Sequence, residues 1–512
     1  MTSTHPIAII GAGPVGLAAA AHLASRQLPF VIIEAGAQPA ASVSAWGHVR
    51  LFSPWRYVID AAARALLAPT AWREPDGAAY PTGAELVDAY LAPLAAHPAL
   101  APHIRTGTRV TAIARQARDK MKDTGRAQSP FVLQLATDGG EERLLASAVI
   151  DASGSYSSPN PVGADGLPAL GEAAASDAIF YGIPDARGIH RGRYLGRRVL
   201  VLGSGHSAFN ALLDLAQLPG AQITWAVRRD DTRQLYGGGA DDGLAERGAL
   251  GLRAQRLVQN GDVTMETGFR AAQIARTEAG LVVCDDDGRA IGPFDELVVC
   301  AGFRPDLTPL RELRISLDPS VEAPVALAPL IDPNVHSCGS VPPHGADELA
   351  HPEPGLYIVG MKSYGRAPTF LLLTGYEQVR SVAAALAGDW AAARDVQLVL
   401  PETGVCSGGP DGGCCAPTPA ASGAIPLLAS FGQPIALIDG GFGRPIALID
   451  GGGFSRPIAL IDSGGFSRPI ALTGVAALTH IAATPTASCC APEAKEQCCG
   501  EDSAGCGCEA GA

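Results

Sequence analysis

IAIIGAGPVGLAAAAHLASRQLPFVIIE, residues 7–34, holds the pattern from which the fold can be predicted. Its two apolar runs, IAII and FVII, predict short buried strands, and the Ala-rich segment between them, from about Pro14 to Ser25, predicts a helix. Gly11, Gly13 and Gly16 lie in the turn from the first strand into this helix. A strand, a glycine-rich turn, a helix and a second strand indicate a βαβ unit of a parallel sheet.

The glycine-rich turn predicts a binding site for a diphosphate. Glycines let backbone N–H groups at a helix N-terminus come close to phosphate oxygens. Glu34 ends the second strand, eighteen residues after Gly16, where a carboxylate can accept hydrogen bonds from ribose hydroxyls. The first unit is therefore predicted to bind a dinucleotide with an unphosphorylated ribose.

A second unit begins with RVLVLGSGHSAFNALLDLA at residue 198 and continues to the strand ITWAV at 223–227. Gly203, Gly205 and Ala208 repeat the fingerprint, but Arg228 and Arg229 follow the strand where an acid would meet a free 2′-hydroxyl. Two guanidinium groups suit a 2′-phosphate, which predicts NADPH, although two arginines at a strand end are also compatible with simple solvation.

The two sites together indicate the cofactors FAD and NADPH. If NADPH binds at the second site, FAD is the dinucleotide that best fits the first, and a hydride would pass from nicotinamide to flavin. The sequence therefore predicts an FAD- and NADPH-dependent oxidoreductase, in which no side chain can be assigned as acid or base.

The composition limits the partners. The net charge is −13 over 512 residues with no long basic run, which argues against nucleic acid. The N-terminus lacks the positive region of a secretory signal, and Pro and Gly interrupt the uncharged stretch 469–492, so we expect a cytoplasmic protein without a membrane span. A small-molecule substrate is expected, and the oligomeric state stays open.

Two crossing segments, VIDASGSYSSPNP at 149–161 and LVVCAGFRPD at 297–306, follow the two units. Together with the two units, they predict an α/β fold of two Rossmann-like domains. The Gly/Pro-rich composition past about residue 400 predicts an extension. The FAD domain is discontinuous, the NADPH domain is inserted into it, and the extension is Gly/Pro-rich and expected to be flexible. The predicted boundaries are 1–165 with 311–400, then 166–310, then 401–512.

The extension contains four related heptapeptides, QPIALID, RPIALID twice and RPIALTG, between residues 433 and 474. They indicate either a repetitive spacer or a small β-solenoid or interaction array. Cysteines crowd the last twenty-four residues, at Cys489, Cys490, Cys498, Cys499, Cys506 and Cys508. Thiolates are soft ligands, so this tail would bind a thiophilic metal or metalloid, relay electrons to a disulfide, or serve no catalytic role.

The chain from about residue 5 to 390 resembles the flavin-containing monooxygenases and their relatives, which share a two-dinucleotide fold with thioredoxin reductase. The resemblance rests on GAGPVGL at 11–17, WGHVRLFSPW at 46–55, GSGHSA at 203–208 and AGFRPD at 301–306. It implies that Trp46, Arg50 and Ser53 contact FAD. It also implies that Gly360 approaches the cofactor, with Lys362 or backbone amides in place of an acid that the thioredoxin-reductase branch has there.

The sequence departs from this family at functional positions. A flavin-facing Asn of the family is replaced by Phe52 or Ser53, and the signature FxGxxxHxxxY is stretched over Phe180, Gly182, His190 and Tyr194. No CxxC of the thioredoxin-reductase kind occurs between 165 and 310.

Three hypotheses follow from the resemblance together with the cysteine tail. The first is an NADPH-dependent monooxygenase that transfers oxygen to a soft nucleophile or carbonyl, linked to arsenic resistance because such flavoproteins are often encoded with arsenic-resistance genes. The second is a flavin reductase of a metal, metalloid or disulfide bound to the tail. The third is a metalloid-binding flavoprotein without catalysis.

Overall fold

The computed structural model describes residues 5–232, 235–236, 245–334, 341–368 and 370–398, together with a short strand pair further on. The chain divides into two units, Met1–Cys415 and Ala416–Ala512. In the second unit, β17 (Leu460–Ile461) pairs antiparallel with β18 (Ser467–Arg468). The rest of the PIALID repeats and the six tail cysteines lie outside the described residues.

The first sheet is parallel and has the order β16-β7-β1-β2-β3. Its strands are β1 (Ile7–Ile10), β2 (Phe30–Ile33), β3 (Ile104–Arg105), β7 (Ala148–Asp151) and β16 (Leu356–Ile358). Helix α1 (Pro14–Ser25) connects β1 to β2, so the predicted first βαβ unit is confirmed with its bounds.

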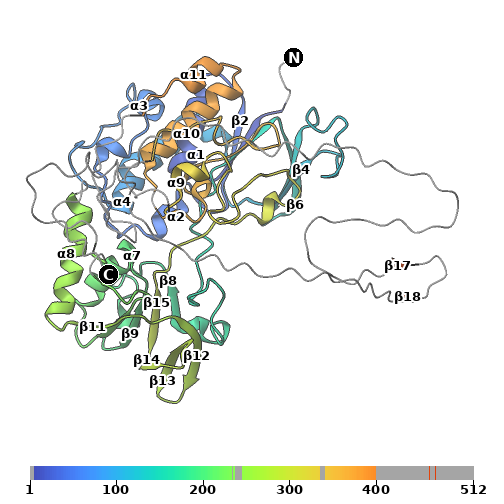
Figure 1. Ribbon diagram of the computed structural model, residues 1–512. Helices are drawn as coiled ribbons and strands as arrows, with labels where there is room; N and C mark the ends of the chain where they lie inside the picture. The colour runs from blue at the N-terminus through green and yellow to red at the C-terminus, as the bar shows by residue number, and fades with distance from the viewer. Residues whose placement is uncertain are drawn as a thin grey trace, which may run out of the picture. The chain divides into compact units, whose positions relative to one another are not determined.

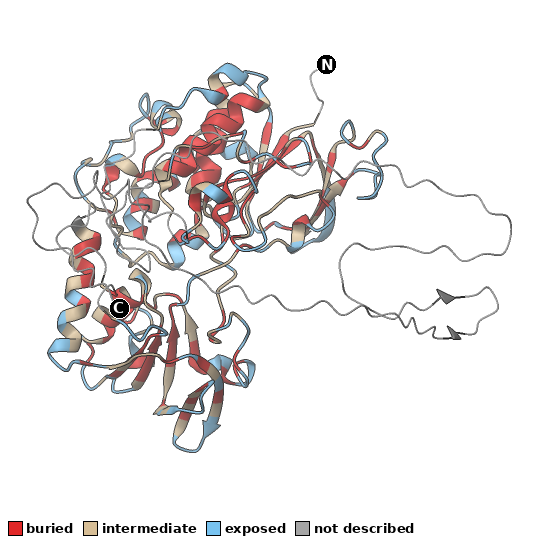
Figure 2. Cartoon of the chain, viewed as in Figure 1, coloured by how far each residue is buried: buried red, intermediate tan, exposed pale blue. Residues whose placement is uncertain are grey.

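Helix α1 is buried from Val15 to Leu23 and packs beside α10 (Leu372–Leu386), as the blue and orange helices show in Figure 1. Small alanine side chains let a helix lie close to both a sheet and another helix, and a helix that is apolar all round belongs in a core. Figure 2 shows the resulting buried layer over the first sheet.

The second sheet is also parallel, with the order β11-β10-β9-β15-β8. Its strands are β8 (Ile179–Tyr181), β9 (Arg198–Leu202), β10 (Gln222–Ala226), β11 (Val263–Glu266) and β15 (Glu296–Val299). Helix α7 (His206–Leu215) connects β9 to β10, and α8 (Ala245–Gln259) precedes β11. The predicted second unit and the α/β class with two Rossmann-like sheets are thereby confirmed.

Two antiparallel sheets complete the first unit, β4-β5-β6 and β12-β13-β14. Their bounds are Arg109–Arg115, Phe131–Thr137, Gly140–Ala146, Ala271–Thr277, Gly280–Asp285 and Ala290–Phe294. The remaining α-helices of the described residues are α2 (Ala41–Ala45), α3 (Ala61–Leu67), α4 (Gly83–Leu86), α5 (Ala92–Ala95), α6 (Arg191–Tyr194), α9 (Ala328–Ile331) and α11 (Trp390–Arg394). Among the described residues, no helix is both long and apolar enough to cross a membrane.

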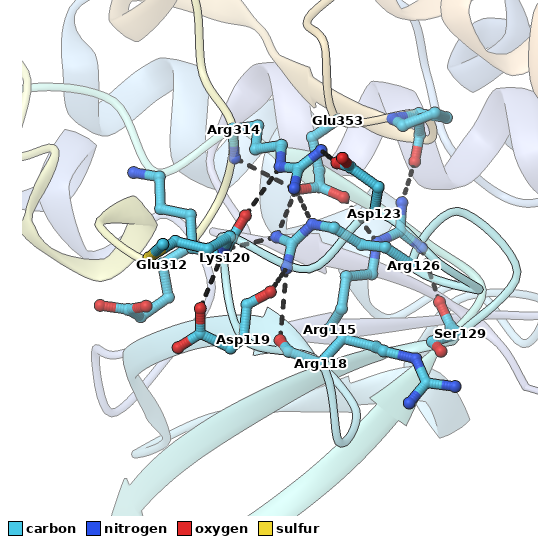
Figure 3. Close-up of polar contacts among 12 residues, drawn as sticks. Arg115, Arg118, Asp119, Lys120, Asp123, Arg126, Ser129, Glu312, Arg314 and Glu353 are labelled. Atoms are coloured by element: carbon cyan, nitrogen blue, oxygen red, sulfur yellow. Dashed lines mark hydrogen bonds and ion pairs between the residues drawn. The ribbon is translucent and has the colours of Figure 1, made fainter. Parts of the chain in front are cut away.

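A buried carboxylate ties distant segments of the first unit together (Figure 3). Glu353 accepts hydrogen bonds from Arg115 Nε at 2.8 Å, Arg126 Nη2 at 2.6 Å and the Arg314 backbone N–H at 3.1 Å. The three side chains of Glu353, Arg115 and Arg126 are at most 3 % exposed. We refer to these residues as the Glu353 cluster.

Candidate active site

Both glycine-rich turns open onto one cavity of about 1270 Å³. Residues of the first sheet on its wall include Gly11, Gly13 and Glu34, and those of the second include Gly203 and Arg228. The volume exceeds the roughly 300–1,000 Å³ of typical single-ligand pockets, so the cavity can hold more than one small molecule at a time.

The first turn is shaped for close approach of a ligand. Gly11 has φ +96°, and a Cβ there would lie 2.7 Å from the Ala152 carbonyl oxygen. A Cβ on Gly16 would overlap the Gly11 carbonyl, so this glycine serves helix–strand packing. A Cβ on Gly13, which lies on the cavity wall, would meet no atom within 4 Å. The open space beside Gly13 is where backbone N–H groups can reach a diphosphate.

Glu34 fixes the first turn through both carboxylate oxygens. Oε2 accepts the Ala12 N–H at 2.7 Å and Oε1 accepts the Gly36 N–H at 2.7 Å. Each oxygen keeps a second lone pair for a ribose hydroxyl. The carboxylate therefore orders the backbone around the ligand as well as facing the cavity.

Replacement of Glu34 by Ala is expected to weaken FAD binding by about 10- to 100-fold, because it removes charge-assisted acceptors and frees the N–H groups of Ala12 and Gly36. Fluorescence titration of the apoprotein with FAD measures this. Glu74→Ala, which removes an exposed partner of Arg64, is the matched control and should leave the affinity unchanged. Equal affinity in the two variants would contradict the role of Glu34.

The second turn repeats the geometry. Gly203 has φ +124°, and a Cβ there would overlap the Cys300 carbonyl, while a Cβ on Gly205 would meet nothing within 4 Å. Ala208 is buried in α7. Trp225 Nε1 donates to the Gly203 carbonyl at 2.7 Å and so holds the turn against β10.

The structure separates the two arginines after β10. Arg228 is exposed, lies on the cavity wall and donates from Nη1 to the Ala164 carbonyl at 2.9 Å. Arg229 is exposed as well, but it does not line the cavity. Arg228 is therefore the better placed of the two to meet a 2′-phosphate.

Only some residues of the segment 46–55 line the cavity. Trp46 and Phe52 line the cavity, and the Phe52 ring lies 5.6 Å from the ring of His206 at the start of α7. Arg50 is exposed and donates to the Tyr80 carbonyl, and neither it nor Ser53 is on the wall. The structure thus brings Trp46 to the cavity but not Arg50 or Ser53.

The two crossing segments meet at the cavity. Tyr156 stacks on Phe303 with ring centroids 5.2 Å apart and an interplanar angle of 29°. Burial raises the pKa of Tyr156, so its phenol stays protonated as a hydrogen-bond donor. Burial also raises the pKa of Cys300 to about 12, which keeps this wall residue a thiol.

Lys362 was expected near the cofactor as one replacement for the family's acid, but its buried ion pair with Asp151 on the cavity wall was not predicted. The strand-end position of Asp151 was the available signal. Gly360, two residues before Lys362, has φ +69° and lines the cavity, and its N–H donates to Gln378 Oε1 at 2.7 Å.

The residues of the stretched monooxygenase signature lie elsewhere. Phe180 and His190 contact each other edge-on at 4.9 Å between ring centroids, and Tyr194 is fully buried. Neither they nor Gly182 line the cavity. Among the described residues there is also no cluster of His, Cys, Asp or Glu suited to a metal ion.

These features define a flavoprotein oxidoreductase with two dinucleotide sites. The two strand–turn–helix turns leave space for a diphosphate where a Cβ would otherwise lie. A carboxylate at the first turn suits FAD, and an arginine at the second suits NADP(H). Bound FAD would mediate electron transfer. The chain belongs to the pyridine nucleotide-disulphide oxidoreductase family, whose model matches residues 8–326. FAD and NADP(H) are its cofactors.

Individual relatives agree with this assignment. A ferredoxin–NADP reductase of Salinispora tropica is 27% identical over 314 residues, which are 61% of this chain and 78% of the relative. Bacillithiol disulfide reductases of Bacillus cereus and Staphylococcus aureus share the fold with TM-scores of 0.56 and 0.55, at 20% and 18% identity. Each match covers 75% of this chain, and 99% and 98% of the two structures.

Proposed function

We propose that the chain is an NADPH-dependent flavoprotein reductase, which uses bound FAD to pass electrons to an acceptor. This acceptor is not one of the described residues. The observation that carries the proposal is the single cavity shared by both glycine-rich turns. Bound FAD would accept a hydride from NADPH and release the electrons to the acceptor.

The chain's own residues would bind the two dinucleotides and shield the reacting rings from water. Gly13 and Gly205 give room for the two diphosphates, Glu34 orders the first turn, and Arg228 offers its guanidinium to the 2′-phosphate. Aromatic side chains on the wall exclude water from the reacting rings. These are Trp46, Phe52, Tyr156 and Phe303.

Two observations favour reduction over oxygen transfer. The amide of the monooxygenases is replaced by Phe52 or Ser53, of which the apolar ring of Phe52 lines the cavity. The residues of the stretched signature pack away from the cavity. The ferredoxin–NADP reductase relative adds support for an acceptor that is a separate redox carrier.

Oxygen transfer to a soft nucleophile or carbonyl is the second candidate, supported by Trp46 and Phe52, which bring the family's flavin-facing segment to the wall. A link to arsenic resistance belongs to this candidate. A metal, metalloid or disulfide on the cysteine tail is a further possible acceptor, and binding without turnover is the remaining alternative.

Oxygen dependence of NADPH consumption distinguishes these functions. A reductase turns over anaerobically with an added ferredoxin, disulfide or metal acceptor and forms no oxygenated product. A monooxygenase requires oxygen and forms one oxygenated product from a panel that includes arsenite and methylated arsenicals. The full-length chain with the six tail cysteines replaced by Ser is the matched variant. We expect it to keep its turnover with free acceptors, and loss of that turnover would show that the tail cysteines relay electrons to the acceptor.

A further inference from the structure

A buried ion pair lies on the cavity wall where the first sheet ends. Lys362 Nζ is 2.7 Å from Asp151 Oδ2 and 3.1 Å from Ser153 Oγ. The Lys362 and Asp151 side chains are 3 % and 2 % exposed, and all three residues line the cavity. Ser153 Oγ in turn donates to Asp151 Oδ1 at 2.6 Å.

The strand order places this pair at the switch point of the sheet. β2 and β3 lie on one side of β1, and β7 and β16 lie on the other. Asp151 ends β7 and pairs in register with Ile10, the residue before Gly11. In open parallel sheets, ligands bind outside the carboxyl ends of the strands at this point.

The pair is also close to the first glycine-rich turn. A Cβ on Gly11 would lie 3.1 Å from the Cα of Ser153, whose hydroxyl contacts the ammonium group. The first turn of α1 contains no acidic side chain that would compete for a cation. Lys362 therefore stands beside the backbone N–H groups that face the diphosphate.

The Lys362 ammonium group has a hydrogen-bond donor that no described residue uses. An ammonium group has three donors, and among the described residues Asp151 and Ser153 accept two of them. Other described cations on the wall, Arg109, Arg228 and Arg366, are exposed. The third donor of this buried ammonium group is therefore left for an acceptor in the cavity.

We propose that Lys362 is a ligand of the FAD diphosphate and that Asp151 and Ser153 position its ammonium group. The inference deepens the FAD site on which the proposed function rests. Lys362 would add a cation to the helix N-terminus of α1, and the carboxylate of Asp151 keeps this cation inside the sheet edge when the cofactor is absent.

The test measures binding to the full-length apoprotein by flavin fluorescence. Lys362→Met should weaken FAD binding by about 10- to 100-fold, the range of a lost charge-assisted bond. The dissociation constant of ADP, which carries a diphosphate but no flavin ring, should rise by a similar factor in this variant. The affinity of the variant for FAD should also depend less on salt concentration.

Two further variants keep the result interpretable. Lys362→Met with Asp151→Asn leaves no buried charge, so it should fold even if the single variant does not, and it should show the same loss of FAD affinity. Arg126→Met removes a buried cation from the Glu353 cluster, which lies away from the cavity wall. It should keep the wild-type affinity for FAD.

Wild-type affinity for FAD in the double variant would overturn the inference alone. So would a wild-type dissociation constant for ADP in the variant together with a shifted flavin midpoint potential, because the ammonium group would then contact the ring. A wild-type protein that binds no FAD would overturn this inference and the proposed function together.

Discussion

Charge reversal at Arg228, as Arg228→Glu, is expected to lower the second-order rate constant of flavin reduction by NADPH by about 10²- to 10³-fold, with little change for NADH. Arg228 lies on the cavity wall, and its exposed guanidinium has further N–H donors besides the one that binds the Ala164 carbonyl. The variant loses a charge-assisted donor and places a carboxylate against the 2′-phosphate. The rate of flavin bleaching under anaerobic conditions measures the effect without an acceptor.

Neighbouring substitutions show whether geometry or net charge is responsible. Arg228→Lys keeps the charge but loses the bidentate fork, so an intermediate rate is expected. Arg229→Glu makes the same change in charge at a residue off the wall, and less than about a threefold loss is expected because exposed charges are screened. Equal losses at both positions would show that only the general field of this surface matters.

Local patterns predicted the two nucleotide-binding units well. The strands at 7–10 and 30–33 and the helix at 14–25 were predicted with the bounds that the structure has. The reason is physical: the turn geometry, the apolar runs and the helix start are all encoded within about thirty residues. For the same reason, the sequence could place at the cavity Gly11, Gly13, Glu34, Gly203 and Gly205.

Long-range contacts could not be predicted in this way. Asp151 and Lys362 are 211 residues apart, and Arg115 and Glu353 are 238 apart. No periodic pattern connects such pairs, which meet only because the sheet order brings their segments together. The residues from Trp46 to Ser53 are a second example. The family motif predicted that this segment lies near the flavin, but it could not predict which of its side chains face the cavity.

Replacement of Glu353 by Leu is expected to destabilise the protein by about 3–5 kcal/mol, because it leaves two guanidinium groups buried without their carboxylate. Arg115 keeps its stacking on Phe131, with the guanidinium carbon 3.6 Å from the ring centroid, but both arginines lose their shared acceptor (Figure 3). Denaturant unfolding measures the loss. Glu74→Leu at an exposed pair should cost less than about 1 kcal/mol.

The pKa of Glu353 gives this interaction a pH signature. Burial acts to raise that pKa, but hydrogen bonds from Arg126 and Arg115 outweigh it, and the net pKa is below the ordinary value. A carboxyl with a lowered pKa in the folded state stabilises the protein above its unfolded pKa of about 4.3, and the contribution is lost as pH falls through the folded pKa. The difference in stability between wild type and Glu353→Leu should therefore be full at neutral pH and shrink in acid.

A second substitution separates charge from lost volume. Arg126→Met in the Glu353→Leu background removes one of the two stranded guanidinium groups and should restore part of the stability, because apolar replacement of buried ions is often neutral or favourable. The same Arg126→Met change in the wild type should destabilise, since Glu353 then loses one of its two side-chain donors. Additive losses in this double-mutant cycle would show that the cluster contributes through packing and not through its charges.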